Sequence, residues 1–209
     1  MTGVQTCALP ICILNTSVLL PAGSKTRIPV SCVEQGRWRQ VSRQFSTGSY
    51  SSARLRARKS RDVSRNLAAV GEARSDQGGV WEEVASHIHA SAAASPTMAM
   101  HDVVEQRGDV LGGFIEAMKY PSEARGVMAA IQGRFVAMDL FDKPGTLERI
   151  WARLVTGYAM DAIRAPEAGK SRPFTAKGAA TLLEHLGQIE CPAFASVGVG
   201  EDWRFEADD

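Results

Sequence analysis

The chain keeps its strand signals and its helix signals in separate blocks, and this order limits the possible folds more than any other feature. Two strand-like runs come first, followed by helical patterns, a hairpin signal, two more helical patterns and a final strand pair. Neither a regular βαβ alternation nor an internal repeat is seen. The order predicts an α+β fold with helices packed against an antiparallel sheet. Because the chain stops just after a presumed strand, we expect a sheet that is truncated at both ends.

The most regular helical pattern follows Lys143-Pro144-Gly145, with Thr146 at or near the cap. Its apolar side chains form one stripe at helical spacing: Leu147, Ile150, Trp151, Leu154, Tyr158 and Ile163. A stripe of this kind is typical of a helix that faces the core. Another helix is expected from about Phe174 to Leu186, with Thr175 as a candidate cap.

Strands are expected where β-branched and apolar runs flank turn residues. The expected pairs are 13–20 with 28–33, the two halves of 126–140 around Gln132-Gly133-Arg134, and 194–199 with 203–206. Helices are expected at 52–65, mostly exposed because apolar residues are sparse there, and at 77–94. A further helix should start at Ser95-Pro96 and break or bend near Gly112-Gly113.

The composition is that of an ordinary soluble globular domain without a transmembrane helix. The 209 residues carry a net charge of +1, with 44% hydrophobic and 22% charged residues. The four cysteines form neither a CxxC pair nor a His/Cys cluster, so a structural zinc site is not expected. A reducing cytoplasm is the default location for such a chain. Basic residues dominate residues 1–74, which indicates either a phosphate or nucleic-acid surface or, as we favour, one half of a fragment.

The first residues are set apart from the rest. Met1 to Ile11 resembles one reading frame of a short-read sequencing adapter, and Cys12 then stands at the junction. We therefore expect residues 1–12 to be artefactual and residues 13–209 to form a single α+β domain, itself a fragment. The segment lacks the charged start and the apolar stretch that a secretory signal requires.

Two groups of polar residues are explained most simply as solvent-exposed residues on helices. The basic run Arg54, Arg56, Arg58, Lys59 and Arg61 is expected to be a solvated helix face rather than a nucleic-acid patch, because aromatic residues are not interleaved with it. The histidines His87, His89 and His101 are expected to be exposed on helices, and His87 and His89 should lie on different faces. No metal site and no cofactor are predicted from them.

The densest cluster of chemically capable residues is 32–38. On a strand, Cys32 and Glu34 would share one face with Ile28 and Val30, because side chains alternate with a period of two. A guanidinium at Arg37 would lower the pKa of the Cys32 thiol, which predicts Cys32 and Glu34 as catalytic groups.

Arg37 and Trp38, just past the end of this strand, are the predicted ligand-binding residues. The alternative gives the same residues a purely structural role. Cys32 then continues the apolar row, Glu34 pairs with Arg37, and Trp38 fills the core.

Two segments of the chain carry a family resemblance: Ile13 to Leu20, and Ile28 to Trp38 with its Cys-Val-Glu-Gln-Gly-Arg-Trp motif. Further matching stretches are 77–84, Ser95-Pro96-Thr97, 133–141 and 151–162. From Ile13 to its end, the chain resembles the ARG and rhodanese/phosphatase superfamily-associated protein domain. The family's association with ADP-ribosylglycohydrolases implies a link to ADP-ribose or other nucleotide-derived metabolites.

Three hypotheses follow from these observations. In the first, the domain binds or processes an ADP-ribose-like ligand through Cys32, Glu34, Arg37 and Trp38. In the second, it is a non-catalytic interaction or scaffold domain. In the third and least favoured, it binds nucleic acid through the basic run.

Overall fold

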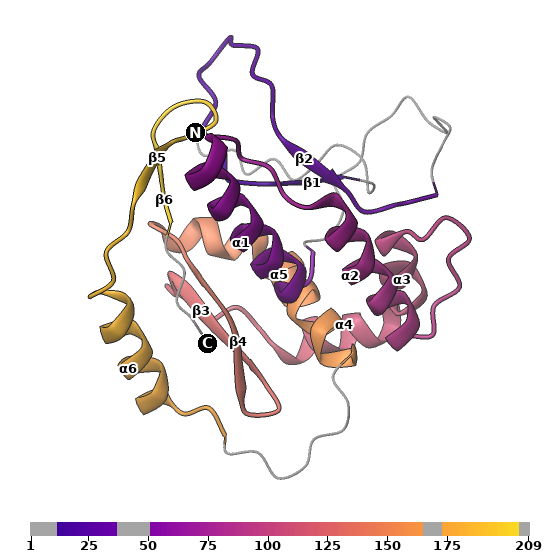
Figure 1. Ribbon diagram of the computed structural model, residues 1–209. Helices are drawn as coiled ribbons and strands as arrows, with labels where there is room; N and C mark the ends of the chain where they lie inside the picture. The colour runs from indigo at the N-terminus through magenta and orange to yellow at the C-terminus, as the bar shows by residue number, and fades with distance from the viewer. Residues whose placement is uncertain (1–11, 37–50, 165–172, 205–209) are drawn as a thin grey trace.

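The computed structural model describes residues 12–36, 51–164 and 173–204, and this part of the chain has the α+β architecture expected from the sequence (Figure 1). In chain order its elements are β1 (Cys12–Leu14), β2 (Val30–Cys32), α1 (Ala53–Val70), α2 (Gln77–Ala90), α3 (Met100–Gln106), α4 (Gly108–Ala117), β3 (Gly126–Ile131), β4 (Arg134–Leu140), α5 (Pro144–Arg164), α6 (Ala176–Leu186), β5 (Ala193–Ala195) and β6 (Glu201–Trp203). The antiparallel α+β class is therefore confirmed.

The described strands pair as three separate antiparallel ribbons, β1 with β2, β3 with β4, and β5 with β6. The longest ribbon, β3–β4, turns through Gln132 and Gly133, which have φ angles of 52° and 77°. Two consecutive positive φ angles match the right-handed twist of the strands that they join, as in a type I′ hairpin. The hairpin predicted around these residues is confirmed, whereas the outer ribbons are shorter than the sequence indicated.

Helix α5 lies at the centre of the fold and joins two groups of core residues. Its first part packs Leu147, Ile150 and Leu154 against the β3–β4 hairpin. Its last turns place Ala159 and Met160 against α2, α3 and α4. The apolar stripe predicted for this helix is thus the core of the molecule, and Pro144 occupies the first helical position, where a missing N–H costs nothing.

The helices before the hairpin are divided differently from the prediction. The break falls at Arg107, between α3 and α4, and the pair Gly112-Gly113 lies inside α4. Ser95 accepts a hydrogen bond from the Ala99 N–H, but the helix itself starts only at Met100. Arg107 donates to the Ser91 carbonyl, which ties the break to the end of α2.

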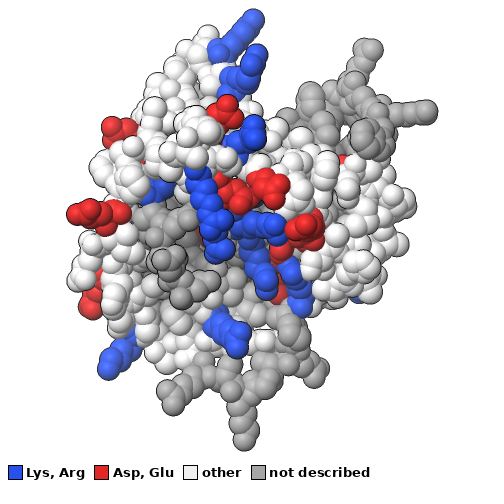
Figure 2. Space-filling model, viewed as in Figure 1, with Lys and Arg blue, Asp and Glu red and all other residues white. Residues whose placement is uncertain are grey.

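Helix α1 is capped by Ser52 and buries a row of side chains at i, i+4 spacing, namely Leu55, Lys59, Val63 and Leu67. The expectation of a solvated basic face is wrong for Lys59, which is only 3% exposed, whereas Arg54 and Arg61 are exposed as expected. Figure 2 shows basic side chains gathered over α1 with acidic side chains beside them. Arg58 pairs with Glu82 of α2 at 3.2 Å, for example. Within the described ranges, no helix has the length and apolarity needed to cross a bilayer.

Candidate functional site: a polar cleft beside helix α1

A cleft of about 440 Å³ lies between α1, the segment that follows β1, and the end of β6. Its lining is mostly polar and combines hydroxyl groups with basic side chains. The lining residues are Leu14, Asn15, Thr16, Ser17, Ser51, Arg56, Lys59, Ser60, Ser64, Asp202, Trp203 and Arg204. Ligand pockets commonly have volumes of about 300–1,000 Å³.

The segment that follows β1 is held in place by buried and partly buried hydrogen bonds. The Lys59 ammonium donates to the carbonyls of Ile13 and Leu14 at 3.1 and 2.7 Å. Ser31 of β2 donates to Asn15 Oδ1 at 2.7 Å, and Asn15 donates in turn to the Ala73 carbonyl. Because buried polar groups are costly when unpaired, these bonds fix the wall formed by residues 14–17.

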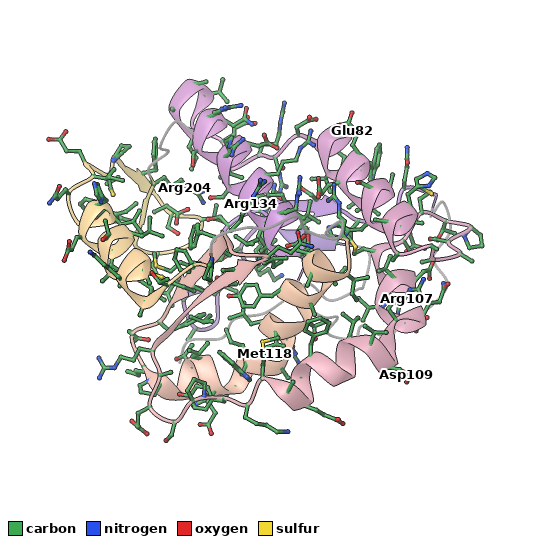
Figure 3. All side chains as sticks on the ribbon, turned by 90° about the horizontal axis from the view of Figure 1, so that it is seen from below. Glu82, Arg107, Asp109, Met118, Arg134 and Arg204 are labelled. Atoms are coloured by element: carbon green, nitrogen blue, oxygen red, sulfur yellow. The ribbon has the colours of Figure 1, made fainter. Side chains whose placement is uncertain are left out.

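The adjoining wall is built by the last residues of the described chain, which bond directly to Thr16. Thr16 donates to Asp202 Oδ2 at 2.6 Å, and Arg204 donates both to Thr16 Oγ1 at 2.7 Å and to Asp202 Oδ2 at 3.1 Å. Figure 3 shows Arg204 near β6, on the side of the molecule away from Arg107. Residues 186 positions apart thus meet in one hydrogen-bonded group.

The third basic residue of the cleft, Arg56, is oriented by residues of β4 and α5. Arg56 makes two parallel hydrogen bonds to Asp139 of β4, at 2.5 and 2.9 Å, and Tyr158 of α5 donates to the same carboxylate at 2.5 Å. Burial raises the pKa of Tyr158, and the adjacent Asp139 raises it further. The tyrosine therefore stays protonated and remains a hydrogen-bond donor to Asp139.

Positive charge exceeds negative charge in the cleft. Among its described lining residues, Arg56, Lys59 and Arg204 are basic, and Asp202 is acidic. The Nε atoms of Arg56 and Arg204 are buried without a hydrogen-bond partner in the described structure. A site with this charge balance and many hydroxyl groups is suited to an anionic, hydrogen-bonding ligand.

Two of the four residues predicted from the sequence lie on or beside β2, outside the lining of the cleft. Cys32 and Glu34 are both half-buried, while Ser31 and Val33 between and beside them are buried. The buried face of this segment is therefore the face that carries Ser31 and Val33, and not the face that carries Cys32 and Glu34. Cys32 Sγ contacts the Glu34 carbonyl at 3.3 Å.

The contacts of Cys32 and Glu34 join β2 and the residues after it to α2 and to the segment before α3. The Gln77 side-chain amide accepts from the Cys32 N–H at 2.9 Å and donates to the Cys32 carbonyl at 2.8 Å. Glu34 Oε1 accepts from Thr97 Oγ1 at 2.8 Å. Arg37 and Trp38 lie outside the described residues, so the complete predicted cluster is not placed, and its catalytic role stays a prediction.

A second polar group, at the junction of α1, α2 and α5, is fully enclosed. His87 Nε2 lies 2.8 Å from Ser52 Oγ and 3.5 Å from Asp161 Oδ1, and the exposed fractions are 1% for His87 and 0% for Ser52. Both of these described partners approach the same ring nitrogen, so Ser52 and Asp161 do not form a relay through the two nitrogens of the imidazole. The expectation that His87 is exposed is wrong, whereas His89 is exposed as expected.

Sequence reasoning did not identify the residues of the cleft as a site. Thr16 lies in the first segment that carries the family resemblance, but nothing in the sequence pairs it with Asp202 and Arg204. Lys59 was placed in a solvated run, although its spacing of four from Leu55 and Val63 was the available signal of burial. In the part of the chain that the structure describes, no cluster of three His, Cys, Asp or Glu is arranged for a metal ion.

Comparison with known proteins gives one match. Residues 12–209 match the family model described as the ARG and Rhodanese-Phosphatase-superfamily-associated Protein domain. Neither a curated protein nor a solved structure matches the chain.

Proposed function

The chain belongs to the family of the ARG and Rhodanese-Phosphatase-superfamily-associated Protein domain, and we propose that its polar cleft binds a phosphate-bearing small molecule of the ADP-ribose class. The family name gives the ligand class only by association, which is a weak argument taken alone. The support specific to this chain comes from the cleft.

The observation that carries the proposal is the convergence of three well-ordered cations on one hydroxyl-rich cleft. Arg204 is held by Thr16 and Asp202, Arg56 by Asp139, and Lys59 by two backbone carbonyls. Cations that are fixed before the ligand arrives lose little side-chain entropy on binding. Guanidinium groups are also strong partners for phosphate oxygens.

The alternative is a non-catalytic interaction domain, and the backbone contacts of Cys32 favour it in part. The two-way hydrogen bond between Gln77 and the Cys32 backbone locks β2 to α2, which is a structural role. Catalysis by Cys32 and Glu34 and a location in the cytoplasm both stay predictions. A ligand-binding cleft is compatible with either a catalytic or a non-catalytic domain.

Isothermal titration calorimetry with ADP-ribose tests the proposal. We expect binding by the wild-type chain, and Arg204→Gln should weaken it by about 1.5–3 kcal/mol because a charge-assisted hydrogen bond is lost. Arg153→Gln is the control, since Arg153 is exposed on α5 and lies outside the cleft. Equal affinity in the two variants, or no binding by the wild-type chain, would overturn the proposal.

A further inference from the structure

The carboxylate of Asp202 is unusual among the groups that line a cleft suited to anions. It projects from β6 with a side chain that is 20% exposed, and it lines the cleft beside Arg204. A carboxylate can hold a cation in place, but it also repels a phosphate, because both groups are negatively charged. Its presence needs either a purely structural explanation or a second part of the ligand.

The two oxygens of this carboxylate have different surroundings. Oδ2 accepts hydrogen bonds from Thr16 and Arg204. Oδ1 accepts none from the residues that the structure describes, and it is not among the buried atoms that lack a partner. Asp202 is thus anchored through one oxygen while the other remains available as an acceptor. An ionised carboxylate accepts hydrogen bonds but does not donate them, so its natural ligand partner is a hydroxyl or an N–H group.

We infer that Asp202 is a specificity-determining residue that accepts a sugar hydroxyl through Oδ1, so that the cleft selects a sugar phosphate over a simple phosphate. This inference rests on the proposed function, because it assigns the phosphate to the basic side chains and the sugar to Asp202. The hydroxyl groups of Ser17, Ser60 and Ser64 line the same cleft and can serve further sugar oxygens.

The test compares ribose 5-phosphate with methyl phosphate, which carries the charge without the sugar hydroxyls. By calorimetry, the wild-type chain should bind ribose 5-phosphate about tenfold more tightly, as expected for a hydrogen bond to a charged group. If both compounds bind equally, the inference fails while the proposed function stands. If neither binds, the inference fails, and the titration with ADP-ribose decides separately whether the proposed function stands.

The variant Asp202→Asn separates hydroxyl recognition from a structural role. It keeps the shape of the side chain but removes the negative charge, which also weakens the contact that holds Arg204 and should affect both compounds alike. Ribose 5-phosphate should therefore lose about tenfold more affinity than methyl phosphate, because only the sugar uses the charged acceptor. A loss of the same size for both compounds would show that Asp202 only supports Arg204, and would overturn the inference. The wild-type comparison decides the question if this variant does not fold.

Discussion

At the scale of single residues, Tyr158 shows how one buried hydroxyl can hold an ion pair in place. It donates to Asp139, and Asp139 in turn holds Arg56 at the cleft. The guanidinium of Arg56 also lies 5.7 Å from the centre of the Tyr158 ring, within the range of a cation–π contact. The tyrosine therefore acts on the cleft from outside its lining.

Replacing Tyr158 by Phe removes only this hydroxyl. We expect Tyr158→Phe to lower the free energy of unfolding by about 1.5–3 kcal/mol, because the lost hydrogen bond is to a charged acceptor. The matched control is Tyr120→Phe, since Tyr120 OH lies near the neutral carbonyls of Ala124 and Pro144 and should contribute about 0.5–1.5 kcal/mol. Urea denaturation measures both, and an equal or larger loss for Tyr120→Phe would contradict this account.

His87 should make the stability of the protein depend on pH. Burial lowers its pKa from 6.5 to about 4, and the charge of Arg164 contributes to the shift. As the pH falls below about 6.5, the unfolded chain takes up a proton that the folded protein does not bind until about pH 4. Stability is therefore lost on acidification across this interval, by about 3 kcal/mol at about 1.36 kcal/mol per pKa unit.

The variant His87→Gln, which cannot titrate, isolates this effect. Between pH 7 and pH 4 it should lose about 3 kcal/mol less stability than the wild-type chain. Burial raises the pKa of the neighbouring Asp161, which has the opposite effect on stability, but Asp161 is present in both proteins. Urea denaturation at several pH values gives the comparison. Identical pH profiles would show that His87 is not a buried neutral group.

At the scale of elements, the sequence predicted the parts of the fold that have strong periodicity. The stripe on α5 and the Gln132-Gly133 turn of the β3–β4 hairpin are local patterns, and both were found as expected. The break between α3 and α4 was missed because it falls at Arg107-Gly108, where Arg107 contacts Ser91, and not at Gly112-Gly113. Local propensity does not report contacts of this kind.

The position of Gly113 inside α4 gives a prediction about this element. A Cβ atom there would meet nothing within 4 Å, so Gly113→Ala should raise the free energy of unfolding by about 0.5–1 kcal/mol through helix propensity. Gly133→Ala is the contrasting variant, because its φ of 77° should make the same change cost about 1–2 kcal/mol. Thermal unfolding compares the two. A destabilised Gly113→Ala would indicate that the helix breaks there after all.

At the scale of the whole molecule, the cleft exists because distant segments meet on α1. Thr16 comes from the start of the described chain and Asp202 from its end, while Lys59 lies on the helix between them. A sequence pattern cannot reveal a site assembled over such separations, so only the fold class and the first segment pointed toward it. Ser31, which directly precedes the motif at 32–38, donates to Asn15 of the cleft.

Amide chemical-shift mapping by NMR during titration with ADP-ribose tests the central claim most directly. We predict that the largest shifts fall on the residues lining the cleft, above all Thr16, Ser17, Ser60, Asp202 and Arg204. Shifts that instead centre on Cys32 and Glu34 would favour the site expected from the sequence motif. That outcome, or a spectrum unchanged by ADP-ribose, would contradict the assignment of the cleft as the binding site.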